Sequence, residues 1–315
     1  MPLNYGDTNM GAILLLEQCL NGLQLGIMLF LMAAGLTLIF GVMGLINLAH
    51  GSLYMIGAFA CAAVASWTGS FTLGLLASVV VAAAAGALIE IGVMRRLYQR
   101  DHLDQVLATF ALILISSEAM RWLFGSYPLY LDVPENFYGA INLFGVLQYS
   151  RYRLFIIVLG LLMAVGIYLL INKTRIGMRI RAGAADRQMT AALGINISLI
   201  FTLVFALGAA LAGFAGALVG SIQSVDIGMG EPVLILAFVV VVIGGIGSIR
   251  GALVGAIIVG MVDTLGRGYL PQLLQLILDP VFANTLGAAL ASIAIYLLMI
   301  IILIFKPQGL FPAHG

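Results

Sequence analysis

The chain has 315 residues, of which 63% are hydrophobic and only 9% are charged, and its 14 Lys and Arg against 13 Asp and Glu give a net charge of +1. Soluble proteins have roughly 45–50% apolar and about 25% charged residues, and nucleic-acid binding requires a basic excess. These totals exclude a soluble domain and a nucleic-acid-binding protein. They predict an all-α fold, a polytopic transmembrane helical bundle with about 8–10 spans, in which residues 1–315 form a single domain. The 2 Cys and 3 His have no ligand spacing, so we expect no metal site.

Apolar segments follow one another along the chain, separated by charges, glycines and prolines. The first run, from about Leu14 to Trp67, contains an irregular stretch near 41–52 and is interpreted as two spans around a break. The other expected spans are, in order, Phe71–Met94, Val106–Phe124, Leu154–Ile171, Ser198–Gly220, Pro232–Ile249, Ala252–Tyr269 and Thr285–Phe305.

Lys and Arg are distributed unequally between the two sides of this arrangement. Counting the spans puts most basic residues on one side, namely Arg95, Arg96, Arg100, Lys173, Arg175, Arg179, Arg181, Arg187, Arg250 and Lys306. The other side has Arg121, Arg151, Arg153 and Arg267. Because cytoplasmic loops carry the excess of Lys and Arg, the first side is expected to be cytoplasmic, with the N-terminus outside and the C-terminus in the cytoplasm.

Three polar residues form a stripe on the first helix. Glu17, Asn21 and Gln24 fall at i, i+4 and i+7, which places them on one helix face. Polar side chains within a span turn toward a cavity or toward a partner helix. Asn21 and Gln24 are therefore candidates for lining a translocation pathway, and hydrogen bonding between helices is the alternative.

The irregular stretch near 41–52 carries further candidate pathway residues. Asn47, His50 and Tyr54 are spaced by three and four residues, with Gly51 among them, so they share one face if the segment is helical. An interrupted helix exposes backbone groups that only protein or a water-lined cavity can satisfy within a membrane. These side chains either line the pathway or only cap the ends of the broken helix.

A second break is predicted at Gly244, Gly245, Gly247 and Ser248. Three glycines in four residues permit backbone conformations that other residues avoid, which favours a hinge or gate, with tight helix crossing as the alternative. The stretches 44–53 and 244–253 are identical at four of ten positions, which hints at an internal repeat. Paired interrupted helices are where transporters build their binding or gating sites.

Acidic residues near the outer ends of two spans have basic neighbours. Glu118 precedes Arg121 by three residues and Asp263 precedes Arg267 by four, which places each pair on one helix face. No acid stands alone in the middle of a span, whereas an ion-coupled secondary carrier usually needs such a site. The sequence also lacks a GxxxxGK[ST] phosphate loop, so ATP hydrolysis would have to come from another chain.

The basic segment 173–196 is too short and too polar to span a membrane. It is Ala-rich from Ala182 to Leu193, where we expect one helix with Gly194 as its C-terminal stop. A short, fairly apolar helix in a basic cytoplasmic loop indicates a docking partner, and a helix lying on the membrane surface is the alternative.

The chain resembles the inner-membrane permeases of ABC importers for branched-chain amino acids, specifically the H-type permease of that family. The resemblance rests on Asn21-Gly22 and on G-L-T-L-I-F-G-V-M-G-L-I-N-L-A-H-G-S-L-Y-M-I-G-A (35–58), R-I-R-A-G-A-A-D-R-Q-M-T-A-A-L-G-I-N (179–196), V-I-G-G-I-G-S-I-R-G-A-L-V-G (242–255) and K-P-Q-G-L-F (306–311). These stretches run from one end of the chain to the other, and I-N-L-A-H-G is distinctive rather than generic apolar sequence.

The resemblance implies a multi-subunit importer in the bacterial inner membrane. This chain would be a non-catalytic subunit without a cofactor of its own, surrounded by membrane lipid and forming half of the pathway with a second related permease. Two cytoplasmic ABC ATPases would bind ATP and Mg, and a periplasmic binding protein would deliver the solute. The ATPase-coupling residues would be Arg179, Arg181, Ala184, Ala185, Asp186, Ala191, Ala192, Leu193 and Gly194. Many relatives have Cys-Ala-Glu-Asp where this chain has Gly183-Ala-Ala-Asp186, so one acidic docking contact would be missing.

The solute implied by the resemblance is a branched-chain or related amino acid. Other relatives with these motifs carry urea, short amides or aromatic acids, and the permease motifs do not separate them. An ion-coupled secondary transporter and a membrane-embedded enzyme are the alternatives from other classes, although no catalytic cluster is legible in the sequence.

Overall fold

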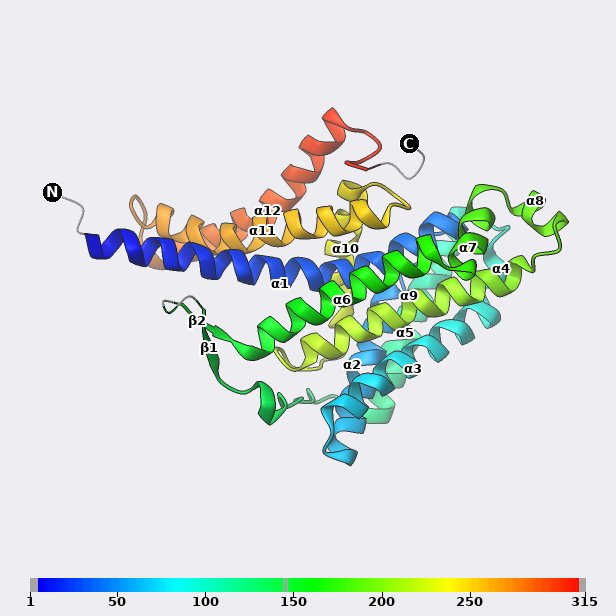
Figure 1. Cartoon of the computed structure of the whole chain (residues 1–315), viewed down its shortest axis with the longest axis horizontal. Coiled ribbons are helices and arrows are strands. Elements are labelled where there is room, and N and C mark those ends of the chain that lie inside the picture. The colour runs from blue at the N-terminus through cyan, green and yellow to red at the C-terminus, as the bar shows by residue number, and fades with distance from the viewer. Residues whose placement is uncertain (1–4, 144, 146, 312–315) are drawn as a thin grey trace.

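The computed structural model describes residues 5–143, 145 and 147–311. In this part of the chain a bundle of helices carries one small antiparallel hairpin (Figure 1). The elements are, in chain order, α1 (Tyr5–Met43), α2 (His50–Thr68), α3 (Phe71–Ile89), the π-helical turn η1 (Glu90–Met94), α4 (Arg95–Leu97), α5 (His102–Phe124), the 3-10 turn η2 (Glu135–Phe137), β1 (Ala140–Leu143), β2 (Leu147–Ser150), α6 (Arg151–Lys173), α7 (Arg175–Ala185), α8 (Arg187–Ala192), α9 (Ile197–Gly220), α10 (Gly230–Gly244), α11 (Ile249–Leu274) and α12 (Pro280–Phe305).

Eight candidate membrane spans are present among the described residues. They are α1, α2, α3 with its continuation through η1 and α4, α5, α6, α9, α11 and α12. Helix α10 is also apolar but has only 15 residues, and at 1.5 Å per residue its length of about 22 Å is less than the ~30 Å hydrocarbon core. The expected polytopic transmembrane helical bundle is confirmed.

Helix α1 is the central element of the bundle. Every residue from Gly26 to Ile39 is buried, and α6 and α11 lie on either side of the helix (Figure 1). The close approach depends on small residues, since a Cβ added at Gly26 would lie 2.8 Å from the carbonyl oxygen of Ala256 in α11. Apolar helices in lipid associate through such close packing of small residues.

Polar residues just before the apolar runs fix several helix starts. Ser70 accepts a hydrogen bond from a backbone N–H in the first turn of α3, Asn196 does so for α9, Ser248 for α11 and Asp279 for α12. An N-cap side chain satisfies one of the backbone donors that the first helical turn leaves free. The loops therefore end where the sequence supplies such a residue.

Two expected helices have different bounds in the structure. The expected span Pro232–Ile249 begins two residues earlier, at Gly230, and is interrupted at the predicted second break, where α10 stops at Gly244 because Gly245 and Gly247 adopt φ of 105° and 82°. These values favour glycine and cannot continue a right-handed helix. The expected helix from Ala182 to Leu193 stops at Gly194 as predicted, with φ of 81° at that residue, but it is not one helix, because the chain is extended at Asp186, with φ of −151°. That residue ends α7, and its carboxylate accepts a hydrogen bond of 2.9 Å from the backbone of α8.

The sequence did not predict the hairpin formed by β1 and β2. Its register pairs Ala140 with Ser150, and it packs over the end of the bundle where α6 begins (Figure 1). Tyr149 clusters with Ile27 of α1 and Ile157 of α6. The hairpin therefore covers one end of the α1–α6 contact.

Candidate functional site

The first break places the start of α2 inside the bundle. Residues 44–49 are not part of any helix, and α2 begins at His50. Nε2 of His50 lies 3.3 Å from the carbonyl oxygen of Met32, which is eleven residues before the end of α1 at Met43. Eleven residues correspond to about 16 Å along a helix. The chain therefore turns back into the bundle, and α2 begins beside the middle part of α1.

Helix α10 begins at the same place. A Cβ added at Gly51 would lie 2.7 Å from the carbonyl oxygen of Gly230, so only glycine permits this backbone contact. The N-cap residues Ala49 and Met229 make no side-chain cap. Two helix N-termini thus meet in the interior, each with roughly half a positive charge from its aligned peptide dipoles. Discontinuous helices with this arrangement form solute and gate sites in transporters.

Buried polar side chains at this meeting point lack partners. Asn47 and His50 are completely buried, and Tyr54 is 1% exposed. The amide of Asn47, Nδ1 of His50 and the hydroxyl of Tyr54 find no hydrogen-bond partner among the described residues. Buried polar groups are nearly always paired, so these groups need water, a solute or another conformation to satisfy them.

The polar stripe of α1 lies in the N-terminal half of the helix. Asn21 accepts a hydrogen bond of 2.6 Å from Nη1 of Arg153 in α6, which is the interhelical arrangement considered for this residue. Gln24 is 7% exposed, and its amide reaches only the sulfur of Met28, at 3.8 Å. The structure therefore separates these two residues from the first break.

The second break lies at the end of α1 instead. A Cβ added at Gly41 would lie 2.9 Å from the Cα of Gly247. Leu310 and Phe311, which follow α12, donate backbone hydrogen bonds of 2.9 and 3.0 Å to the last carbonyls of α10. The second break therefore packs beside the start of the first break, whereas the end of the first break, at Gly51, meets Gly230.

Helices α7 and α8 form a projecting surface at the end of the molecule where α1 ends (Figure 1). Gly177, Ile180 and Gly183 are the buried face of α7. Met189 is 61% and Leu193 74% exposed. Also exposed are Arg179, Arg181, Ala185, Asp186, Ala191, Ala192 and Gly194, and Ala184 is half-buried. Exposed large apolar side chains on a basic segment are typical of a surface that contacts another protein or the membrane.

Arg187 connects this surface to the first break. Its Nη2 donates a hydrogen bond of 3.1 Å to the carbonyl oxygen of Val42 in the last turn of α1, immediately before the break at Gly44. Its guanidinium also lies 5.2 Å from the ring centroid of Phe201 in α9. A guanidinium over an aromatic face is attracted to it. One side chain at the start of α8 thus contacts both α1 and α9.

Glu90 forms a buried polar network at the same end. The side chain is 0% exposed and pairs with Arg95 at 3.0 Å. The hydroxyl of Thr202 in α9 donates to it at 2.6 Å, and that of Tyr98 at 2.8 Å. Burial and the Glu90 carboxylate raise the pKa of Tyr98 above its ordinary range, so this phenol remains a donor. The network ties the end of α3 to α9.

The two ion pairs expected within helices are present. Glu118 contacts Arg121 on the exposed surface of α5. Asp263 lies 2.8 Å from Arg267, which also donates to Ser292 of α12 at 3.0 Å. Both acids are therefore neutralised locally, as their spacing predicts.

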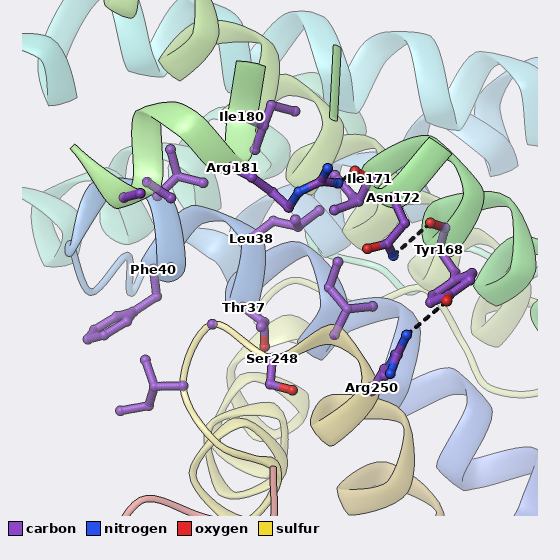
Figure 2. A pocket seen from close by; sticks show the side chains of 17 residues that line it. Thr37, Leu38, Phe40, Tyr168, Ile171, Asn172, Ile180, Arg181, Ser248 and Arg250 are labelled. Atoms are coloured by element: carbon purple, nitrogen blue, oxygen red, sulfur yellow. Dashed lines mark hydrogen bonds between the residues drawn. The ribbon is translucent and has the colours of Figure 1, made fainter. Parts of the chain in front are cut away.

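A cavity of about 520 Å³ separates the projecting surface from the second break. Ile180, Arg181 and Ala184 of α7 line one wall, and Ser248 and Arg250 line the opposite one (Figure 2). The structure thus brings part of the predicted coupling segment close to the predicted second break. No sequence motif predicted that these two segments lie close together.

A polytopic bundle in which two helices begin against each other in the interior defines the class of membrane permeases with discontinuous helices. Residues 18–303 match the family described as branched-chain amino acid transport system, permease component. The chain belongs to this family.

Several curated proteins are similar to the chain. It is 32% identical to the high-affinity branched-chain amino acid transport system permease protein BraD of Pseudomonas aeruginosa, over 94% of this chain and 95% of BraD. It is 31% identical to the corresponding protein LivH of Escherichia coli strain K12, over 81% of this chain and 87% of LivH. LivM of the same strain, also named as a permease protein of that transport system, is 27% identical over 90% of this chain and 67% of LivM. No solved structure matches the chain.

Sequence reasoning missed Gly230, the contacts of Arg187, and the partners Thr202 and Tyr98 of Glu90. A signal for Gly230 was present, because glycines on both sides of Met229 precede Pro232, and proline in the first turn marks a helix start. The sequence identifies Arg187 only as one of several basic residues in a loop. Its contact with Val42 spans 145 residues of sequence, and no local pattern predicts such a pairing.

Proposed function

We propose that the chain is the permease subunit of an ATP-driven ABC importer that takes up branched-chain or related amino acids across the bacterial inner membrane. A second related permease completes the pathway, two cytoplasmic ABC ATPases bind the ATP and Mg, and a periplasmic binding protein delivers the solute. The N-terminus lies outside and the C-terminus in the cytoplasm, which requires an odd number of crossings, so the segment 221–229 and the short helix α10 together complete a ninth one. Family membership together with the similarity to both LivH and LivM supports a pair of related permeases.

The observation that carries the proposal is the exposed α7–α8 surface. Met189 and Leu193 are apolar, and exposing them to solvent is unfavourable unless a partner covers them. The sequence has no phosphate loop of its own, so a docking surface for an ATPase supplies what the chain lacks. The contact of Arg187 with the end of α1 can transmit motion of that surface to the interior of the bundle.

The mechanism that fits this geometry is alternating access. Closure of the ATPases displaces α8, and Arg187 moves the last turn of α1 and the segment 44–49 with it. That displacement separates the starts of α2 and α10 at Gly51 and Gly230 and opens the interior. The unpaired groups of Asn47 and His50 then become available to the solute.

The solute is tested by competition during uptake. Cells that depend on this importer are given labelled leucine with excess isoleucine, valine, urea, acetamide or benzoate. We expect the two branched-chain amino acids to abolish uptake and the other three to leave it unchanged. Competition by urea or acetamide alone would assign the importer to amides, and uptake that ignores ATP depletion but collapses with the ion gradient would indicate a secondary carrier.

Replacement of Arg187 by Gln is expected to uncouple ATP hydrolysis from transport. The variant loses the charged donor to Val42 and the contact with Phe201, so we expect uptake per ATP hydrolysed to fall about tenfold, equivalent to roughly 1.4 kcal/mol. Arg187→Lys keeps a charged donor and should recover part of the loss, whereas Arg151→Gln, at the exposed first residue of α6 and away from α7 and α8, should match the wild type. If Arg187→Gln and the wild type take up equal amounts of solute per ATP hydrolysed, coupling does not pass through the contact of Arg187 with Val42.

A further inference from the structure

The cavity between α7 and the second break has an unusual combination of walls. Leu38 and Val42 of α1, Ile171 of α6 and Ile180 of α7 contribute branched apolar surface. Arg181 and Arg250 reach toward it from opposite sides (Figure 2). Its volume of about 520 Å³ lies within the range of small-molecule sites, which is roughly 300–1,000 Å³.

The charge of the cavity is positive. No Asp or Glu is found among the residues that line it, and neither arginine has a salt bridge within the described part of the chain. Arg181 donates to the carbonyl of Ile171, and Arg250 donates to the hydroxyl of Tyr168 at 2.8 Å. A guanidinium has five N–H donors, so both keep donors for an anion. Carboxylates are the anions that this planar group binds best in two-point contacts.

The floor of the cavity has an unsatisfied hydroxyl. Thr37 is completely buried, and its Oγ1 finds no hydrogen-bond partner among the described residues. Figure 2 shows this hydroxyl facing Ser248, whose own Oγ accepts from the backbone of Gly251 at 3.1 Å. A buried hydroxyl without a partner is unfavourable in the empty cavity. It offers a further hydrogen-bond partner to the polar group of a ligand that reaches it.

We propose that this cavity binds the carboxylate of a small molecule with a branched apolar side chain, and that such a molecule inhibits uptake from the cytoplasmic side. The inference rests on the proposed function, since the solute released there has this chemistry. The apolar walls take the side chain, and Arg181 and Arg250 take the carboxylate. A ligand that bridges α7 and Arg250 holds the coupling segment against the second break and so opposes the motion that transport requires.

The same walls predict which part of the ligand is recognised. An ammonium group finds only neutral side-chain oxygens, those of Thr37, Ser248, Asn172 and Tyr168, because no carboxylate lines the cavity. The site therefore recognises the carboxylate and the branched side chain of the ligand, and does not recognise its amino group. A branched-chain 2-oxo acid should bind at least as tightly as the matching amino acid, unlike at a site designed for amino-acid uptake.

Binding is tested on the full chain in nanodiscs of zwitterionic lipid. The probes are leucine and 4-methyl-2-oxopentanoate, titrated separately and followed by ligand-observed NMR. We expect both to bind, the oxo acid no more weakly than leucine, and Arg250→Gln to weaken both at least tenfold. Arg175→Gln removes a similar charge outside the cavity and should change nothing. Absence of binding, or binding that Arg250→Gln leaves intact, overturns the proposal.

A second variant separates binding from folding. Thr37→Val keeps the shape of the side chain and removes the unpaired hydroxyl, so it should raise the melting temperature of the empty protein while weakening both probes severalfold. If Thr37→Val lowers both the melting temperature and the affinity for the probes, the hydroxyl has a merely structural role and the assignment is overturned. Nanodiscs with phosphatidylglycerol form a further arm, because a lipid phosphate offers similar chemistry. If neither probe binds but phosphatidylglycerol raises the melting temperature of the protein, the cavity binds a lipid headgroup instead.

Inhibition is tested in proteoliposomes of the complete importer loaded with 4-methyl-2-oxopentanoate. We expect loading to slow uptake severalfold in the wild type and not in Arg250→Gln. Equal uptake with and without loading overturns the inhibitory role. If the chain supports no uptake at all, the proposed function fails, whereas the nanodisc measurement still decides whether the cavity binds the probes.

Discussion

Replacement of Ala192 by Glu abolishes uptake while the protein still inserts into the membrane. Ala192 is exposed in the last turn of α8, next to Leu193, so an ATPase that docks there buries the new carboxylate. A buried charge without a partner costs roughly 3–5 kcal/mol, which weakens association more than a hundredfold. The measurement is uptake of labelled solute together with the ATPase activity of purified complexes.

The matched control for this substitution is Thr72→Glu. Thr72 is exposed in the first turn of α3, where the helix dipole tolerates an acid, so the control adds the same charge without touching the α7–α8 surface. Its uptake should equal that of the wild type. Wild-type uptake by the Ala192→Glu protein, at equal amounts in the membrane, would refute the assignment of α8 as a docking surface.

Replacement of Gly230 by Val prevents the starts of α2 and α10 from packing and eliminates transport. An added Cβ would overlap the carbonyl oxygen of Gly51, so the two backbones must separate. Overpacking of a buried site costs roughly 1–3 kcal/mol, and here a rigid backbone, not a flexible side chain, has to move. We expect a lower melting temperature in detergent and no measurable uptake.

A control glycine distinguishes this contact from a general effect of glycine. A Cβ added at Gly166, inside α6, meets no atom within 4 Å, so Gly166→Ala should retain uptake and be neutral or stabilising by up to about 1 kcal/mol. Gly51→Ala should reproduce the Gly230 phenotype, since it faces the same contact from α2. A Gly230→Val protein that transports at the wild-type rate would contradict the placement of the gate at this contact.

The sequence predicted the fold well wherever a local signal exists. Composition and apolar runs indicated the membrane bundle, and the helix start at Phe71 and the end at Phe305 agree with the structure. The break before His50 was visible in the Gly-containing stretch. Local patterns did not predict the split at Asp186, because an extended backbone in an Ala-rich run contradicts helix propensity.

The arrangement of the candidate site was less predictable. The residues around Asn47 and His50 could be named from their spacing, but their partner could not, because Gly230 lies 179 positions after Gly51 and the contact has no side-chain chemistry. The similarity between 44–53 and 244–253 suggested that the two breaks act together. In the structure the second break contacts only the start of the first break, at Gly41, because the chain then turns back to place His50 beside Met32. Close packing between helices determines these depths, and sequence periodicity does not predict them.

The most direct test of the account is co-purification from the native membrane. The tagged chain is expressed from its own locus, solubilised in mild detergent, and its partners are identified by mass spectrometry. The account predicts a second hydrophobic permease and P-loop ATPases, with the ATPases lost from the Ala192→Glu protein. A wild-type chain that purifies alone and transports solute by itself in liposomes would contradict it.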